Sequence, residues 1–459
     1  MLFNSYSFAL GFLPLSLVLF YTVSRWNRQA GKVLLLLLSL VFVSSTGLIH
    51  GLIALGSTLI NFCICKQMCR AHSSKRALLT AGILFNTMLL CLFKYVPGLG
   101  LPLGISFYCF QQIAFLADSY RETSDVSLTD YSLFVLFFPK AVQGPIPYGS
   151  ELLPQLQDMK PGFRFDRFSR SLFLFSLGLA KKVLLADKFA IIADHGFSSI
   201  GVLTGYEALL TILAYTLQLY FDFSGYSDMA VAVGWMFGIE LPWNFDSPYK
   251  AKNITDFWRR WHITLSRFLT KYIYIPLGGS RAGTVRTFLN ILIVYLVSGI
   301  WHGTGMTFLV WGLLHAAASI AYRLAKKPYD RLPGALQWCL QFAFVNLTWV
   351  FFRAPSLGAA GALLGRLAAG GWTLSLNAEL AESLMQPTFL SVPAQFIGIH
   401  AAVLLAFVGA LALVAFARNS RELVQRFRPG WLTLLATYLL LLCSILSMSG
   451  VSSFLYTNF

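Results

Sequence analysis

Two histidines in one apolar stretch are the side chains best suited to chemistry in this chain. The stretch WHGTGMTFLVWGLLHA spans residues 301–316 and places His302 and His315 among aliphatic and aromatic neighbours. A neutral imidazole near pH 7 is the usual general base for taking a proton from a hydroxyl group. Ionisable residues at membrane depth also mark functional sites. We therefore treat His302 as a candidate catalytic residue, with an imidazole used only for packing as the alternative.

The spacing of these two histidines argues against a shared metal ion. Thirteen residues of unbroken helix would place them about 20 Å apart at 1.5 Å per residue. The glycines at 299, 303 and 305 favour a break at His302, so that His302 ends one segment and His315 lies inside the next. The chain contains neither Gly-x-Ser-x-Gly nor His-Glu-x-x-His, which excludes serine hydrolase and zincin chemistry of those types. We predict no metal site.

A second candidate region is LPWNFDSPYKAKNITDFWRRWHITLSRFLTKYIYIPLGGSR, residues 241–281. Asn253 is the expected N-cap of a helix that continues through Phe268. The cationic candidates for receiving an anionic substrate such as a phosphorylated cofactor are Lys250, Arg259 and Arg260. An interfacial amphipathic helix with snorkelling cations is the alternative.

One acidic residue also lies in an apolar segment. Asp222 belongs to LQLYFDFSGYSDMA. We predict that it lines a polar cavity rather than facing lipid, because a carboxylate in hydrocarbon is costly. Hydrogen bonding between helices, worth roughly 1 kcal/mol per pair, is the alternative.

The elements that position these residues are membrane helices. Of 459 residues, 57% are hydrophobic and 12% are charged, and the mean hydropathy is +0.66. An average soluble domain has about 25% charged residues. Apolar runs long enough to cross a hydrocarbon core of about 30 Å recur along the chain. We predict an all-α polytopic membrane protein with about 11–13 transmembrane helices plus re-entrant or interfacial helices. The expected spans are 7–24, 33–46, 48–63, 77–94, 101–117, 171–186, 206–221, 225–238, 287–300, 306–323, 336–352, 394–416 and 431–448.

The formal net charge of +16 does not indicate nucleic-acid binding, because the basic residues form short clusters between apolar runs. Arg25, Arg28 and Lys32 make one such cluster, and similar groups recur at 66–76, 326–331 and 418–428. Loops rich in Lys and Arg stay cytoplasmic, which predicts an N-terminus on the periplasmic or external side. We expect no nucleic-acid partner.

We predict a single membrane domain over 1–459, and no internal repeat is apparent that would support an inverted-repeat transporter. Residues 1–119 form N-terminal helices and 120–170 an interfacial or re-entrant region. Residues 171–353 form a catalytic core with the histidine motifs, and 354–459 an external loop and C-terminal helices.

Several motifs together resemble the membrane-bound O-acyltransferase family. They are WHGTGMTFLVWGLLHA, YFDFSGYSDMA, the 241–281 region from NFDSPYKA onward, PLGISFYCFQ and LTWVFFRAPS, and the resemblance continues to the terminal SSFLYTNF. The similar branch is the integral-membrane subunit of bacterial alginate or polysaccharide O-acetylation. The resemblance implies helices around a central funnel or channel that crosses the bilayer. It also implies that His302 is the essential catalytic residue and that His262, from Arg-Trp-His, is a second functional position.

The resemblance further implies a reaction and its partners. An acyl group, commonly acetyl from acetyl-coenzyme A, passes from a cytoplasmic thioester to an exopolysaccharide such as alginate. The resemblance implies two kinds of partner, a periplasmic SGNH-type acyltransferase and polysaccharide export machinery, and a location in the bacterial inner membrane. We expect no bound cofactor. We expect Trp301 and Trp261 to wall the channel and His315 to support it. A transporter or channel for an acylated or charged solute, D-alanyl-type transfer to a cell-envelope polymer and a structural subunit are the alternatives.

Overall fold

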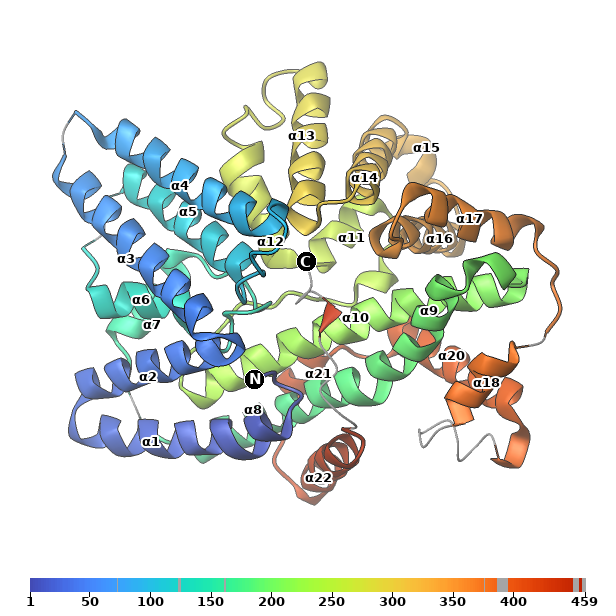
Figure 1. The fold of residues 1–459 in the computed structure, drawn as a ribbon, viewed down its shortest axis with the longest axis horizontal. Helices are drawn as coiled ribbons and strands as arrows, with labels where there is room; N and C mark the ends of the chain where they lie inside the picture. The colour runs from blue at the N-terminus through green and yellow to red at the C-terminus, as the bar shows by residue number, and fades with distance from the viewer. Residues whose placement is uncertain are drawn as a thin grey trace. The chain divides into compact units, whose positions relative to one another are not determined.

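The computed structural model describes residues 1–71, 73–122, 125–160, 162–374, 376–385, 395–448 and 454–455. All regular structure in these residues is helical, as predicted, and Figure 1 gives the order of the helices. Part of the expected external loop at 354–392 and most of the terminal SSFLYTNF lie outside the described residues. Two compact units share the chain. The first contains Met1–Leu179, Tyr226–Trp243 and Arg426–Phe459, and the second contains Ala180–Gly225 and Asn244–Gln425. The prediction of a single domain is not tested by this division.

The first unit contains the N-terminal helices. Its helices are α1 (Leu13–Trp26), α2 (Arg28–Val43), α3 (Leu48–Arg70), α4 (Lys75–Tyr95), α5 (Ile105–Arg121), α6 (Leu128–Leu136), α7 (Gly149–Gln157), most of α8 (Phe165–Ala180) and α22 (Trp431–Leu446), and a π-helical turn at Ser7–Phe12 precedes α1. Buried polar contacts connect some of these helices. Lys32 on α2 donates to Asp130 on α6 at 2.7 Å, and Asn61 on α3 donates to Gln112 on α5 at 2.6 Å. These pairs satisfy polar groups that would be costly to bury alone.

The second unit contains the histidine motifs. Its helices are α9 (Asp187–Ser198), α11 (Ile254–Arg260), α12 (Ile263–Leu269), α13 (Thr284–His302), α14 (Met306–Leu324), α15 (Lys326–Asp330), α16 (Gly334–Arg353), α17 (Leu357–Ala369), α18 (Ala378–Met385), α20 (Ile399–Phe416) and α21 (Ser420–Gln425). A π-helical turn at Lys181–Ala186 leads into α9. The long helix α10 (Gly205–Met236) belongs to this unit up to Gly225 and to the first unit beyond it.

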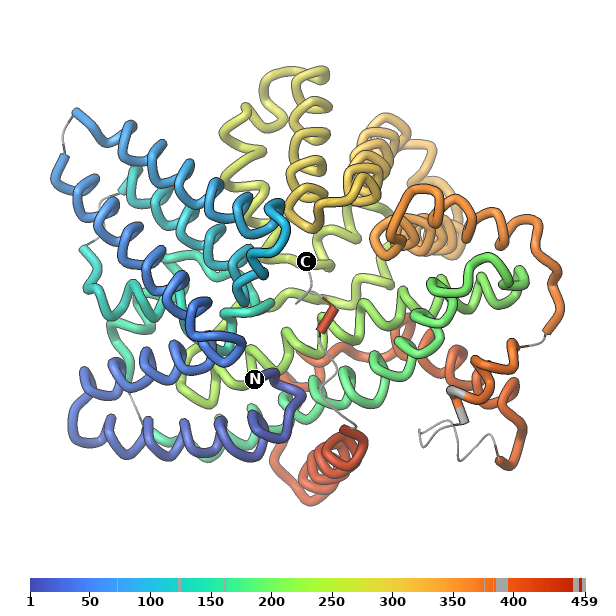
Figure 2. The backbone as a smooth tube through the Cα atoms, in the orientation of Figure 1, coloured from blue at the N-terminus to red at the C-terminus, as the bar shows by residue number. Residues whose placement is uncertain are grey.

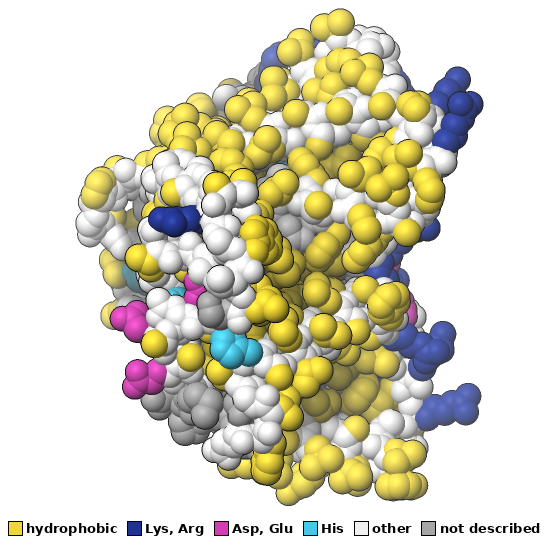
Figure 3. All heavy atoms as spheres, turned by 90° about the vertical axis from the view of Figure 1, so that its right-hand side faces the viewer, with side chains coloured by type: hydrophobic (Ala, Val, Ile, Leu, Met, Phe, Trp, Pro, Cys, Tyr) yellow, Lys and Arg dark blue, Asp and Glu magenta, His cyan; other side chains and the backbone are white. Residues whose placement is uncertain are grey.

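Eight of the described helices are long and apolar enough to cross a membrane, and each coincides with a predicted span. They are Ser7–Trp26, Arg28–Thr46, Leu48–Arg70, Lys75–Tyr95, Thr284–His302, Met306–Leu324, Gly334–Arg353 and Ile399–Phe416. The chain is a multi-pass membrane protein. Exposed hydrophobic side chains cover much of the face seen in Figure 3, and most of the Lys and Arg side chains visible there gather along one edge.

Of the five remaining predicted spans, 101–117, 171–186, 206–221 and 225–238 lie on buried or half-buried helices, whereas 431–448 is the 16-residue apolar helix α22, which is mostly exposed. The expected spans 206–221 and 225–238 are wrong as two segments, because α10 runs through both without a break. Ser224 and Gly225 do not interrupt it: α10 is buried throughout this stretch, and packing can hold a glycine that costs only about 1 kcal/mol in a helix. The expected span 101–117 is α5, whose 17 residues are mostly buried and include Gln111 and Gln112. Hydropathy alone therefore does not separate helices that face lipid from helices inside the protein.

Candidate active site

The helical hairpin α13–α14 carries His302 and His315. As predicted, α13 ends at His302 and α14 begins at Met306, after a three-residue connection. Figure 2 shows the two helices side by side. Glycines permit this close approach: a Cβ atom on Gly299 would lie 2.5 Å from the Phe308 carbonyl oxygen, and one on Gly312 would lie 2.6 Å from the Tyr295 carbonyl oxygen. Small residues at such crossings let helix backbones pack closely in membranes.

The His302 side chain is enclosed by aromatic rings. It is 3% exposed. Its ring centroid lies 4.8 Å from that of Trp301, 5.3 Å from Trp311 on α14 and 5.2 Å from Phe352 on α16. Three elements of the second unit therefore fix the position of this imidazole and shield it from solvent.

The His262 side chain lies at a break that sequence reasoning did not predict. The single helix expected from Asn253 through Phe268 is wrong, because α11 ends at Arg260 and α12 begins at Ile263. His262 joins them in the left-handed conformation, with φ 42° and ψ 53°. This conformation costs a residue with a Cβ atom about 1–2 kcal/mol. Strain of this kind is concentrated at functional sites, where the surrounding structure maintains it.

Asn244 holds the α12 side of this break. Its carbonyl oxygen accepts from the Ile263 backbone N–H at 3.0 Å. Its side-chain Oδ1 accepts from the Thr264 backbone N–H at 3.2 Å and from the Thr264 hydroxyl at 2.6 Å. Asn244 thus caps the start of α12, where His262, the residue at the N-cap position, makes no side-chain cap bond.

The same amide oxygen determines the proton position on His262. Asn244 Oδ1 lies 3.4 Å from His262 Nδ1. The Thr264 donors identify this atom as the amide oxygen, which can only accept, so a hydrogen bond between it and Nδ1 requires that Nδ1 carries the proton of the neutral ring. The Nε2 lone pair is then left to accept a proton, and Nε2 has no hydrogen-bond partner among the described residues. Burial lowers the pKa of His262 to about 3, so its imidazole is neutral at physiological pH.

Trp301 contacts both candidate histidines. Its ring centroid lies 6.2 Å from that of His262 and 4.8 Å from that of His302. Phe223 on α10 packs edge-on against His262 at 4.8 Å. The structure therefore brings together two motifs that are forty residues apart in the chain. Whether Trp301 walls a channel stays a prediction.

His315 and His302 both contact Trp311. His315 is fully buried, and its ring centroid is 4.8 Å from that of Trp311. The indole N–H of Trp258 on α11 donates to His315 Nδ1 at 3.3 Å. The helix break brings the two imidazoles closer than the roughly 20 Å of a continuous helix, because both contact the same Trp311 ring. No group of three or more His, Cys, Asp or Glu in the described residues could hold a metal ion.

The predicted cationic residues have different surroundings. Arg260 donates to the Asp256 carboxylate at 2.9 Å and to the Asp246 carbonyl at 3.2 Å. Lys250 donates to the Ala417 carbonyl at 2.6 Å, on the segment after α20. Arg259 is exposed. Arg259 is thus the cation of this set best placed for a ligand, whereas Arg260 and Lys250 hold the local fold.

Two further predicted residues have structural partners. Asn253 is the N-cap of α11, as predicted, and its side chain accepts from the Asp256 backbone N–H at 2.8 Å. Trp261 is 2% exposed and packs on Trp349 at 5.0 Å between ring centroids. In these surroundings Trp261 is part of the aromatic core, and the structure gives no evidence that it walls a channel.

Asp222 is buried rather than exposed to lipid. Lys182, on the π-helical turn before α9, lies 2.7 Å from Asp222 and 2.8 Å from Asp187. Such a buried pair is costly to break because it leaves an uncompensated charge. Sequence reasoning did not identify Lys182, which lies forty residues before its partner.

Sequence reasoning also missed Asn244, Trp311 and Phe352. A usable signal existed for Trp311, since residues four apart on a helix are neighbours and Trp311 precedes His315 by four. Asn244 belongs to a motif that was recognised, but its contact with His262 depends on the left-handed turn. Phe352 comes from a separate helix, and only packing reveals it.

Comparison with known proteins is consistent with this arrangement. The model of the MBOAT, membrane-bound O-acyltransferase family matches residues 35–358, which include every candidate residue above. The chain is similar to a peptidoglycan O-acetyltransferase of Helicobacter pylori at 37% identity, over 100% of this chain and 98% of that protein. It is similar to a probable alginate O-acetylase AlgI of Pseudomonas putida at 36% identity, over the full length of both. A teichoic acid D-alanyltransferase of Bacillus subtilis is 26% identical over 54% of this chain.

Proposed function

The chain belongs to the membrane-bound O-acyltransferase family and is an acyltransferase, and we propose that it uses His302 to move an acetyl group from a cytoplasmic thioester toward a polysaccharide hydroxyl. The observation that carries this proposal is the enclosure of the His302 imidazole by Trp301, Trp311 and Phe352. A base fixed by rings from three elements loses little entropy when a hydroxyl is brought to it.

The proposed reaction is a direct acyl transfer. His302 accepts the proton of the incoming hydroxyl while its oxygen attacks the thioester carbonyl. The new C–O bond forms, the C–S bond breaks, and the imidazolium returns the proton to the leaving thiolate as a free thiol. A positioned general base of this kind is worth about 10²–10⁴-fold in rate.

His262 is the second residue of the proposed site. Its Nε2 has no hydrogen-bond partner among the described residues and carries a lone pair when Asn244 holds the proton on Nδ1. Trp301 packs against both imidazoles and is the side chain that connects them. We assign Asn244 as a positioning residue that acts through His262.

The donor proposed is acetyl-coenzyme A, and no bound cofactor is required. Arg259 would attract its phosphates from an exposed position on α11. This attraction would weaken with ionic strength, because exposed charges are screened over about 10 Å in 0.1 M salt. A periplasmic SGNH-type acyltransferase would receive the acetyl group, and polysaccharide export machinery would supply the acceptor. The proposed location is the bacterial inner membrane, with the N-terminus periplasmic.

The names of two relatives supply candidate acceptors. Similarity over nearly the full length of a peptidoglycan O-acetyltransferase makes peptidoglycan the first acceptor to test, with alginate the second. The weaker and partial similarity to a teichoic acid D-alanyltransferase makes D-alanyl transfer less well supported.

The test uses purified full-length protein in vesicles with acetyl-coenzyme A labelled in the acetyl group. We expect wild type to release free thiol and to label a hydroxyl acceptor, and His302→Ala to do neither. His400→Ala, at an exposed histidine, is the matched control and should retain activity. Full transfer by His302→Ala would overturn the proposal. Solute movement without thioester cleavage would identify a transporter, and a chain that neither binds donor nor depends on His302 would be a structural subunit.

The acceptor is tested in cells that lack their own O-acetyltransferase. Base-labile acetate is measured on purified peptidoglycan and on alginate after expression of the chain with its genomic neighbours. Acetate on peptidoglycan alone supports the first acceptor, and acetate on alginate alone reverses the order. D-alanine esters in place of acetate would overturn the proposed acyl group.

A further inference from the structure

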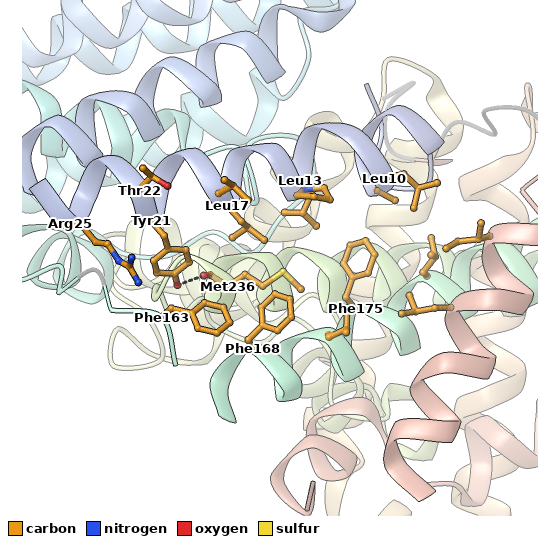
Figure 4. A pocket seen from close by; sticks show the side chains of 17 residues that line it. Leu10, Leu13, Leu17, Tyr21, Thr22, Arg25, Phe163, Phe168, Phe175 and Met236 are labelled. Carbon is orange, nitrogen blue, oxygen red and sulfur yellow. Dashed lines mark hydrogen bonds between the residues drawn. The ribbon is translucent and has the colours of Figure 1, made fainter. Parts of the chain in front are cut away.

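An apolar groove in the first unit has no role in the proposed reaction. It has a volume of about 620 Å³ and lies along α1, with α8, α22, Phe163 and Met236 completing its walls. Figure 4 shows Leu13, Leu17 and Phe175 along this groove. The volume falls within the range of about 300–1,000 Å³ that is typical of small-molecule sites.

The groove has the length and chemistry of an acyl-chain site. Leu13 and Arg25 are twelve residues apart on α1, which corresponds to about 18 Å of helix at 1.5 Å per residue. One leaflet of a hydrocarbon core of about 30 Å is about 15 Å deep. The groove is open on one side, because Leu10 and Val18 are 59% and 64% exposed. A ligand could therefore enter from the lipid phase without a change in fold.

One end of the groove is polar and cationic. Tyr21, Thr22 and Arg25 line it, and the Tyr21 hydroxyl donates to the Met236 carbonyl at 2.6 Å (Figure 4). The guanidinium of Arg167, on α8, lies close enough to Tyr21 to interact with it electrostatically.

The two cations at this end come from different helices. Arg25 alone would be explained by its position in the last turn of α1, where a cation complements the helix dipole. Arg167 lies instead in the first turn of α8, where the dipole favours an anion and a cation gains nothing from it. The nearby acid, Asp166, is paired with Arg164 at 3.1 Å, which offsets its charge.

We propose that this groove binds one acyl chain of an anionic phospholipid, with the headgroup phosphate at Arg25 and Arg167. The apolar walls match the chain, and the cationic end matches the phosphate. If the N-terminus is external, Arg25 lies at the cytoplasmic leaflet, where anionic lipids are concentrated. The proposal does not depend on the acyl-transfer reaction, because no groove residue is part of the proposed active site.

The experiment measures lipid bound to the full-length protein after detergent purification. The protein is delipidated and incubated with phosphatidylglycerol that carries a photoreactive acyl chain, in vesicles of phosphatidylglycerol and phosphatidylcholine. We expect cross-links at Leu17 or Phe175. Arg25→Gln should reduce the preference for phosphatidylglycerol over phosphatidylcholine by roughly fivefold, which corresponds to about 1 kcal/mol per cation.

Two matched pairs of variants control the experiment. Leu17→Trp should fill the groove and remove the cross-link, whereas Leu15→Trp, at an exposed position on α1 outside the groove, should retain it. Arg76→Gln, at an exposed position on α4, should leave the lipid preference unchanged. Equal labelling by both lipids, or retention of the cross-link in Leu17→Trp, would overturn the proposal. A change of oligomeric state in Leu17→Trp would instead identify a second copy of the chain as the occupant.

Discussion

The α11–α12 break and the α13–α14 hairpin each bury histidines among aromatic rings, but they hold them by different means. At the break, a strained backbone presents His262 and the side-chain oxygen of Asn244 contacts its Nδ1. In the hairpin, close helix packing places His315, and the Trp258 indole N–H donates to its Nδ1. One histidine therefore faces an acceptor and the other faces a donor.

This difference assigns different chemistry to similar side chains. A neutral imidazole that donates from Nδ1 has a basic Nε2, whereas one that accepts at Nδ1 carries its proton on Nε2. His262 can therefore accept a proton at Nε2, and His315 cannot. Burial and residue type are the same at the two positions, so the hydrogen-bond partner of Nδ1 is what distinguishes a reactive candidate from a supporting one.

The largest expected effect tests the hairpin itself. His302→Ala should lower acetyl transfer by about 10²–10⁴-fold, because the proposed general base is removed. His315→Ala should have a much smaller effect. Thiol release from acetyl-coenzyme A in vesicles, normalised to folded protein, measures both. Equal losses of acetyl transfer in the two variants would contradict the assignment of His302 as the base and His315 as a supporting residue.

The next largest effect tests the amide at the break. Asn244→Ala should lower kcat by up to about a hundredfold, because a small displacement of a group at a reaction centre can cost about 10²-fold. Asn244→Asp, which retains an acceptor oxygen, should recover most of the rate. A role in stability alone would predict less folded protein with an unchanged kcat, and that outcome would contradict the assignment.

The burial of His262 at the break should make the stability of the folded protein depend on pH. Burial lowers the pKa of His262 to about 3, whereas the ordinary value is 6.5. Between these values the unfolded chain binds a proton that the folded chain does not, so stability is lost as pH falls below 6.5. At pH 5, titration of His262 lowers the free energy of unfolding by about 2 kcal/mol relative to neutral pH.

His262→Asn provides the comparison for this pH dependence, because asparagine tolerates the left-handed conformation. The fall in Tm between pH 7.5 and pH 5 should be smaller in this variant than in wild type. An identical fall would show that His262 does not contribute to acid sensitivity.

A smaller effect is expected on the exposed side of α11. Arg259→Ala should raise the KM for acetyl-coenzyme A by roughly fivefold, corresponding to about 1 kcal/mol for one lost cation. Arg260→Ala should mainly lower Tm, because Arg260 bonds to Asp256 and the Asp246 carbonyl. Steady-state kinetics at low and high salt, together with Tm, distinguish the effect on donor binding from the effect on stability. An unchanged KM in Arg259→Ala would reject its role in donor binding.

The smallest effect is expected for the indole that contacts His315. Trp258→Phe removes one neutral hydrogen bond, worth about 0.5 kcal/mol at the low end of the usual range, or a factor of about two. The rate of acetyl transfer should change by no more than this. A loss of rate comparable to that of Asn244→Ala would show that the contact with Nδ1 of His315 matters as much for the reaction as the contact with Nδ1 of His262.

Much of the fold could be predicted from local patterns. Runs of apolar residues identified the eight described helices that are long and apolar enough to cross a membrane, because polar side chains are costly to bury in hydrocarbon. Glycines around His302 predicted the end of α13, and Asn253 predicted the start of α11. These features depend on residues that are close in the chain.

The family and the candidate histidines were also accessible from the sequence. The motifs around His262 and His302 indicated the membrane-bound O-acyltransferases, and the family model covers both. The exact catalytic role of each histidine stays a prediction, as does the identity of the donor.

Other features depended on contacts between distant segments. The left-handed turn at His262 is maintained by Asn244, eighteen residues earlier, so the local helical pattern at 253–268 gave the wrong answer. The helix α10 is continuous where two spans were expected, because surrounding packing outweighs the cost of about 1 kcal/mol for Gly225 in a helix.

The sequence by itself determined the membrane class and the residues that could react, and its thirteen expected spans included the eight long apolar helices of the described residues. Only the tertiary structure decided which nitrogen of each imidazole is available, because that depends on the partner of Nδ1, which comes from a different segment in each case. Helix position follows from hydropathy along the chain. The position of the proton on each imidazole follows from hydrogen bonds between segments that are far apart in the chain.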